Sequence, residues 1–144
     1  MLIVTIVLFV VFLDIAIIHG MWGFQIWWPE RDEQKLARTI VGSPGIKRMP
    51  APVQCFVVTA VMIGAAILVL LLGGLWSLPI LPLWLIKWAA MALAAGLLMR
   101  GLIGFTGFWV RLLPEEPFRT FNRRYYSPLC LVLAAGIVIL LNDI

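Results

Sequence analysis

The residues of this sequence best able to do chemistry are ionisable side chains inside long apolar stretches. Arg100 has 12 uncharged residues before it and 10 after it, and a guanidinium in such a place can hold an anionic group. Asp14 and His19 interrupt the first apolar run, and each can move a proton. Hydroxyl groups open the last apolar run. The candidate polar site therefore comprises Arg100, Asp14, His19, Tyr125, Tyr126 and Ser127.

The ionisable residues also have structural interpretations. A charge at the bilayer centre costs roughly 2.5–3.5 kcal/mol even on the mildest scale, so we expect Arg100 to be buried against protein and to work with Asp14 or His19. Alternatively, the Arg100 side chain extends to the lipid head groups. Asp14 is alternatively neutral or hydrogen-bonded to Thr59 or Thr106, and His19 is alternatively a hydrogen-bonded residue near the membrane interface.

Membrane-spanning helices must position these side chains. The chain has 144 residues, of which 63% are hydrophobic and 12% charged, and its mean hydropathy is +1.06. A soluble domain of this size cannot bury so much apolar surface. A disordered chain is also excluded, because disordered chains contain few hydrophobic residues. We therefore expect an all-α fold, a polytopic transmembrane four-helix bundle in a single membrane domain, 1–144. The expected helices are 2–24, 53–75, 83–110 and 128–144.

Turn signals set the expected limits of these helices. Glycines and prolines in 73–82 (GGLWSLPILP) indicate a tight turn between the second and third helices. Ser127 as the N-cap and Pro128 in the first turn predict the start of the last helix. The first and third helices then run in the same direction, which places the three ionisable groups at similar depths in the inner leaflet.

Two further features concern packing. The polar segment after the first run predicts a short surface helix at the cytoplasmic face, residues 29–41, with Pro29 at its first position. An irregular loop is the alternative. Small residues at helical spacing from Arg100 predict that a second helix approaches closely at Ala92, Gly96 and Gly104.

Several functional classes are disfavoured by what the sequence lacks. The two cysteines are isolated from each other and the chain has one histidine, so we expect no metal and no haem site. No nucleotide-binding or hydrolase motif is present, so we expect no cofactor. The missing motifs also favour a protein without catalysis over an enzyme. Most of the 11 basic residues lie in two segments that flank apolar runs, which indicates contact with lipid head groups and not with nucleic acid.

Two functions of different class remain. The first is a small integral inner-membrane protein without catalysis, acting as an accessory subunit or a lipid-contacting helical module. The alternative is a membrane-embedded binding site or enzyme for a lipophilic anionic substrate, built on an inner-leaflet cluster of Arg, His and Asp. The expected partners are the lipid bilayer and anionic lipid head groups, with a larger membrane complex or a homo-oligomer. A transporter is a weaker third option, because four helices without an internal repeat form a pore only as an oligomer.

The last third of the chain carries a recognisable signature. Residues 118–136 (FRTFNRRYYSPLCLVLAAG) resemble the ending F-x-x-x-D-x-x-x-YSPLCL of a family of small bacterial membrane proteins, known as domain of unknown function 3995. The segments 19–22 and 98–105 are similar to its H-x-x-W and L-L-R-x-x-G-x-F segments. Asn122 stands where the family pattern has Asp, and 23–25 replaces a run of small residues. The resemblance implies four membrane helices and no particular activity.

The distribution of basic residues predicts the orientation. Lys and Arg are retained on the cytoplasmic side of a membrane. The first and third loops carry nine of them and the middle turn carries none, so both charged loops should be cytoplasmic. The basic residues of these loops are Arg31, Lys35, Arg38, Lys47, Arg48, Arg111, Arg119, Arg123 and Arg124. We expect a multi-pass protein of the bacterial inner membrane with both termini in the periplasm.

Reporter fusions test this orientation. Fusions after Ser77 and Ile144 should place the reporter in the periplasm, and a fusion after Ser43 should place it in the cytoplasm, because the basic loops resist translocation. Paired alkaline phosphatase and green fluorescent protein fusions measure both locations. The opposite activity pattern would contradict the predicted topology.

Overall fold

The apolar runs form four long helices in the computed structural model, which describes all 144 residues. The structure is entirely helical, and four helices are long and apolar enough to cross a membrane. The chain is therefore a multi-pass membrane protein, because a helix satisfies its own backbone hydrogen bonds in lipid. The spans are α1 (Leu2–Gly23), α3 (Pro52–Leu72), α4 (Leu83–Ile103) and Phe118–Leu141, which ends in α7 (Ser127–Leu141).

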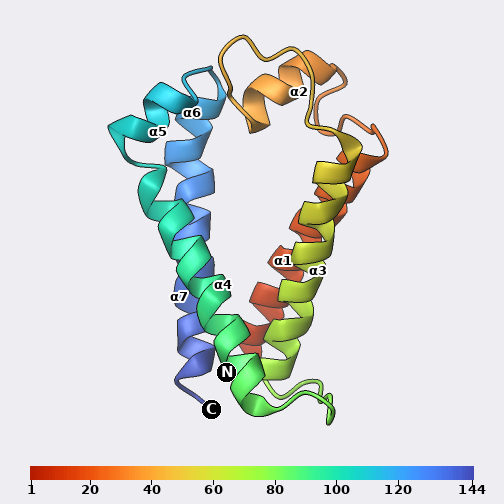
Figure 1. Ribbon diagram of the computed structural model, residues 1–144, viewed down its shortest axis with the longest axis vertical. Helices are drawn as coiled ribbons and strands as arrows, with labels where there is room; N and C mark the ends of the chain where they lie inside the picture. Colours follow the sequence, from red (N-terminus) through yellow and green to blue (C-terminus); the bar gives the residue numbers. More distant parts are fainter.

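The spans pack mainly as two pairs, α1 with α3 and α4 with α7 (Figure 1). The pairs approach each other at the end that holds both termini, here called the narrow end, and diverge toward the opposite, wide end (Figure 1). Toward the narrow end, side chains from all four spans form one apolar core. Its most buried members are Phe12, Val69, Ala90, Ile137 and Leu140. This core holds the two pairs together below the region where they separate.

At the wide end, α2 (Glu33–Ile40) lies between the two pairs (Figure 1). This helix confirms that the segment 29–41 contains a short helix, although it starts four residues later than Pro29. Its start is set by Asp32, whose Oδ1 accepts a hydrogen bond from the Lys35 backbone N–H at 2.7 Å. Leu36 and Ala37 are fully buried, and they pack with Trp22 and Cys55 at the ends of α1 and α3.

Polar contacts tie α2 and the loop after it to the other pair. Arg38 Nε donates to Glu115 Oε2 at 3.2 Å, and the Gly45 backbone N–H donates to Glu115 Oε1 at 3.2 Å. The Tyr126 hydroxyl donates to the Thr39 carbonyl at 3.1 Å. The segment therefore bridges the two pairs at the end where the spans themselves have separated.

The predicted end of the third helix at residue 110 is wrong, because α4 ends at Ile103. The chain then turns and starts a separate short helix, α5 (Gly107–Leu112). Thr106 caps α5 by accepting from the Trp109 backbone N–H at 3.3 Å, and its own hydroxyl donates to the Ile103 carbonyl at 2.6 Å. Arg100 therefore lies in the last turn of the span, about 4.5 Å along the axis from its end, and not deep inside a longer helix.

The predicted start of the last helix at residue 128 is also wrong. The span begins ten residues earlier with α6 (Phe118–Phe121) and continues through a π-helical turn, η1 (Asn122–Tyr126), into α7. Ser127 is inside this helix and does not cap its start. Pro128 lacks an N–H and would clash with the carbonyl four residues before it in a regular α-helix. The wider π-helical turn directly before Pro128 relieves that conflict.

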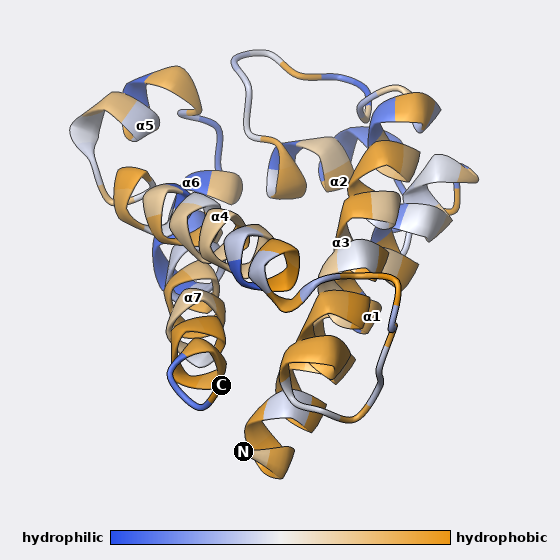
Figure 2. Ribbon diagram, turned by 60° about the horizontal axis from the view of Figure 1, so that its bottom comes forward, coloured by the Kyte–Doolittle hydropathy of each residue, from blue (hydrophilic) through white to orange (hydrophobic).

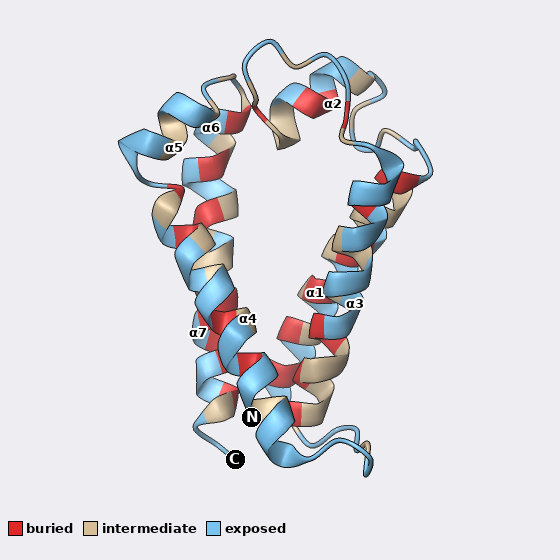
Figure 3. Cartoon of the chain, viewed as in Figure 1, coloured by how far each residue is buried: buried red, intermediate tan, exposed pale blue.

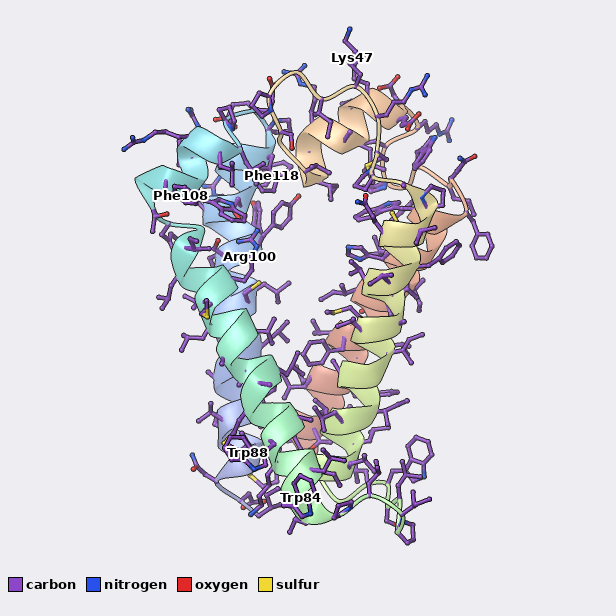
Figure 4. All side chains as sticks on the ribbon, in the orientation of Figure 1. Lys47, Trp84, Trp88, Arg100, Phe108 and Phe118 are labelled. Carbon is purple, nitrogen blue, oxygen red and sulfur yellow. The ribbon has the colours of Figure 1, made fainter.

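The outward faces of the spans are apolar and exposed, as lipid contact requires. Figure 2 shows the hydrophilic segments gathered around α2, α5 and α6, whereas the spans are mainly hydrophobic. Figure 3 shows buried residues between the helices of each pair and exposed residues on the outer faces. Lys47 lies at the wide end, and Trp84 and Trp88 lie at the narrow end (Figure 4). This arrangement matches the charged and aromatic borders of a membrane-spanning fold.

The predicted packing stripe on the third helix is only partly correct. Gly104 is buried, but Ala92 and Gly96 are exposed, and a Cβ at Gly96 would meet nothing within 4 Å. The face of α4 that packs on α7 carries Ala94 and Gly101 instead. At about 100° per residue, Gly96 is turned by about 200° from Ala94, so the part of the stripe at Ala92 and Gly96 points away from the α4–α7 interface.

Two glycines of α4 provide a matched test of this packing. Gly101→Leu should destabilise the protein by about 1–3 kcal/mol, because a Cβ there lies 2.5 Å from Leu131 Cδ2 and 3.1 Å from the Ser127 carbonyl oxygen. Gly96→Leu should not destabilise it. The free energy of unfolding in detergent micelles, measured by titration with a denaturing detergent, reports both changes. Equal effects of the two substitutions would show that α4 does not pack as described.

Candidate functional site

The Arg100 guanidinium is held by neutral groups at the wide end of α4 (Figure 4). Its Nη2 donates to Asn122 Oδ1 at 2.8 Å, and its Nη1 lies 3.4 Å from Ser127 Oγ, which accepts a longer hydrogen bond. Ser127 Oγ donates in turn to Asn122 Oδ1 at 3.2 Å. Asn122 Nδ2 donates to the Gly104 carbonyl at 2.8 Å. Every polar atom of the Asn122 side chain therefore has a partner, and these partners fix the orientation of its amide.

The π-helical turn brings Asn122 and Ser127 to one face of the last span. In a regular α-helix, residues five apart point about 140° away from each other. In a π-helical turn the hydrogen bonds join residues five apart, so these residues lie almost above one another. Asn122 is 2% exposed and Ser127 is fully buried. The same turn that accommodates Pro128 therefore builds the pair of side chains that receives Arg100.

Close approach of α4 to this pair depends on Gly104. A Cβ at Gly104 would collide with Ser127 Oγ and lie 3.1 Å from Asn122 Nδ2. The turn after Gly104 also returns α5 toward Arg100, so that the guanidinium carbon lies 4.7 Å from the centre of the Trp109 ring. This contact is a cation–π interaction. The buried Trp109 Nε1 has no hydrogen-bond acceptor in the chain.

A cavity of about 590 Å³ separates the two pairs of spans at the wide end. Arg100 and Trp109 line it from one pair, and His19, Trp22 and Cys55 line it from the other. The rest of its wall is mostly apolar and comes from α2, α3, α6 and the loops beside α2 and α5: Ile40, Val41, Met49, Pro50, Val53, Gln54, Val57, Val58, Leu113 and Phe118. Arg100 is the only charged residue in this wall, because no Asp, Glu or Lys lines the cavity. The cavity is therefore apolar with one positive group at its side.

His19 lies across this cavity from Arg100 and is partly exposed. Its Nδ1 is 2.8 Å from the Ile15 carbonyl, which is an acceptor, so Nδ1 carries the proton in a neutral ring. The ring centre lies 4.7 Å from that of Trp22. His19 Nε2 makes no hydrogen bond within the chain, so it is the atom free to accept one from a molecule in the cavity.

The structure brings only some of the predicted site residues together. Arg100 and Ser127 share one hydrogen-bonded network, and His19 lines the same cavity. Tyr126 reaches α2, whereas Tyr125 is 55% exposed. The site also contains residues whose role the sequence reasoning missed, Asn122 and Trp109.

The predicted partnership of Arg100 with Asp14 or His19 is not present in the structure. Asp14 is exposed and forms no ion pair, since the three ion pairs of the chain all lie at the wide end outside α1 and α3. Asp14 follows the fully buried Phe12 by two residues, which turns it about 200° away from the packed face of α1. A similar depth in the membrane does not bring Asp14 and Arg100 together, because the rotation of α1 turns the Asp14 carboxylate outward.

Two double-mutant cycles separate these alternatives. Arg100→Met and Asn122→Leu should each destabilise the protein, and the double variant should lose about 1–3 kcal/mol less than the sum, because the two side chains share a charged hydrogen bond. Arg100→Met with Asp14→Leu should be additive to within about 0.5 kcal/mol, as expected for groups without contact. Unfolding in detergent measures both cycles. Coupling in the Asp14 cycle, or its absence in the Asn122 cycle, would contradict the observed network.

Comparison with known proteins places the chain in a family. The model of the family described as "Protein of unknown function (DUF3995)" matches residues 12–137, which include Arg100, Asn122 and Ser127. No curated protein and no solved structure matches the chain. The match spans most of the sequence and confirms the resemblance noted in its last third. This multi-pass membrane protein belongs to the DUF3995 family.

Proposed function

We propose that the protein binds an amphiphilic anion, with its anionic group beside Arg100 in the cavity between the two pairs of spans. It acts as a lipid-contacting module without catalysis. The observation that carries this proposal is the positive charge of Arg100 in a cavity wall that has no carboxylate. Asn122 and Ser127 orient the guanidinium but leave its charge uncompensated.

The electrostatics favour an anion over a neutral ligand. A charge in a membrane-spanning segment finds a partner or faces water, and neutral acceptors stabilise a guanidinium less than an anion does. Asn122 and Ser127 each occupy one guanidinium nitrogen, which leaves further N–H groups available. The Trp109 Nε1–H also lacks an acceptor in the chain, but it is buried and is not counted as a donor to the ligand. A phosphate or carboxylate oxygen can accept from the remaining guanidinium N–H groups.

The shape of the cavity favours an amphiphile. Its wall is apolar apart from a few groups, so it suits hydrocarbon next to the anionic group. The basic residues around the wide end favour an orientation in which this end faces the cytoplasm, and we propose that the protein lies in the bacterial inner membrane with its termini in the periplasm. Anionic phospholipids of the inner leaflet then supply ligands at the level of Arg100.

A second candidate function, an enzyme for a lipophilic anion, draws on His19. Its free Nε2 lines the same cavity and can accept a proton from a ligand held by Arg100. No cysteine, serine or carboxylate in the wall is paired with this histidine as an activated nucleophile would be. Binding without chemistry is therefore the better supported proposal.

The test is binding of anionic lipid by the purified full chain in a neutral detergent. Native mass spectrometry should show that phosphatidylglycerol binds more tightly than phosphatidylcholine with the same acyl chains. Arg100→Gln should reduce binding of phosphatidylglycerol about tenfold or more, because a hydrogen bond to a charged group contributes roughly 1.5–3 kcal/mol. Binding of phosphatidylcholine should not change.

Arg111→Gln is the matched control, because Arg111 is exposed on α5 and does not line the cavity. It removes the same charge near the same membrane surface and should leave the preference for phosphatidylglycerol intact. Equal losses in the two variants would mean that the preference reflects general surface charge and would refute the Arg100 site. His19→Gln should leave binding unchanged under the non-catalytic proposal, whereas loss of a chemical conversion of the lipid would favour the enzyme.

A further inference from the structure

A second, wholly apolar hollow lies between α3 and α4 nearer the narrow end. Its volume is about 400 Å³, and all but one of its lining residues are hydrophobic, the exception being a glycine. Small residues create the hollow on both helices, Gly64 and Ala65 on α3 and Ala89 on α4, while Leu68, Leu85 and Leu93 form its walls. A Cβ at Gly64 would meet nothing within 4 Å. The hollow is therefore open space at the edge of the packed core, which Ala65 joins from the same helix.

The hollow continues the helix faces that line the Arg100 cavity. On α3, Val58 lines the Arg100 cavity, and Val61, Ala65 and Leu68 follow it at helical spacing into the hollow. On α4, Leu93 lines the hollow and Arg100 lies seven residues further along, which is about two turns on the same face. The two spaces therefore lie one after the other along the α3–α4 side of the molecule.

The distance from Arg100 to the end of the hollow is long enough to take a hydrocarbon chain longer than one leaflet is thick. From Arg100 to Leu85 is 15 residues of α4, or about 22 Å along the helix axis. The hydrocarbon layer of one leaflet is about 15 Å thick, half of the ~30 Å core. A chain that starts at the level of Arg100 therefore runs past the middle of the membrane before it reaches the end of the hollow.

We infer that the hollow between α3 and α4 holds one acyl chain of the amphiphile whose anionic group lies at Arg100. This inference rests on the proposed function, and it adds that the site selects long chains. Charge supports this occupant, because the only charged group on the path is the cation at its wide end. Lipid tails around the protein are as apolar as the hollow, so the hollow contributes shape and contact area and not a hydrophobic driving force.

The experiment compares single-chain anionic lipids that differ only in chain length. Binding of stearoyl and lauroyl lysophosphatidylglycerol to the full chain in neutral detergent is measured by native mass spectrometry. The stearoyl lipid should bind about tenfold more tightly, because the added methylene groups contact the walls of the hollow. Gly64→Phe should remove this advantage, because it weakens binding of the stearoyl lipid more than binding of the lauroyl lipid. The open space at Gly64 allows the ring to enter without disturbing the fold.

Ala135→Phe is the matched control, because Ala135 is exposed on α7 and lines neither space. It should preserve the preference for the stearoyl lipid. Equal binding of both lipids, or an unchanged preference in Gly64→Phe, would overturn the inference while loss of binding in Arg100→Gln still supports the proposed function. Unchanged binding in Arg100→Gln would overturn both. A monomer–dimer shift in Gly64→Phe, seen by light scattering, would show that a second copy and not an acyl chain fills the hollow.

Discussion

The position of one guanidinium governs much of the structure at the wide end. Arg100 lies in the last turn of a membrane-spanning helix, where an unsolvated charge is costly. Two neutral hydrogen-bond acceptors and the face of an aromatic ring offset this cost: Asn122, Ser127 and Trp109. Neutral partners hold the side chain in place without cancelling its charge. A carboxylate partner would have neutralised the positive charge of Arg100, and the site would then not attract an anion.

Two irregular features surround Arg100, and a third lies above the cavity that it lines. The π-helical turn aligns Asn122 with Ser127, the break after Gly104 brings Trp109 back over the guanidinium, and α2 bridges the diverging pairs above the cavity. Each departs from a regular hairpin of α-helices. Regular helices running to the membrane surface would leave Arg100 without Ser127 aligned with Asn122 and without Trp109. The narrow end needs no such device, since its apolar core already joins all four spans.

The sequence predicted the spans well and the site only in part. Hydropathy and the glycine–proline turn at 73–82 located four helices because lipid demands long apolar segments. Positions within a span also gave depth, and so placed Arg100 and His19 near one cavity. The rotation of each helix about its own axis was harder to predict from the sequence. Apolar residues cover every side of these spans, so no polar face shows which side packs. The outward direction of Asp14 and the wrong stripe through Gly96 share this cause. The π-helical turn was not predicted, because Ser127–Pro128 is also the pattern that is typical of a helix start.

We propose that the Arg100 guanidinium contacts the anionic group of an amphiphile in the membrane. Solid-state NMR of the full chain in phosphatidylglycerol bilayers tests it directly, by dipolar coupling between labelled arginine side-chain nitrogen and lipid phosphorus. We expect a short nitrogen–phosphorus contact that is present in Arg111→Gln and disappears in Arg100→Gln. A spectrum in which Arg100→Gln removes no such contact would contradict it, because the guanidinium would then be satisfied by Asn122 and Ser127 alone.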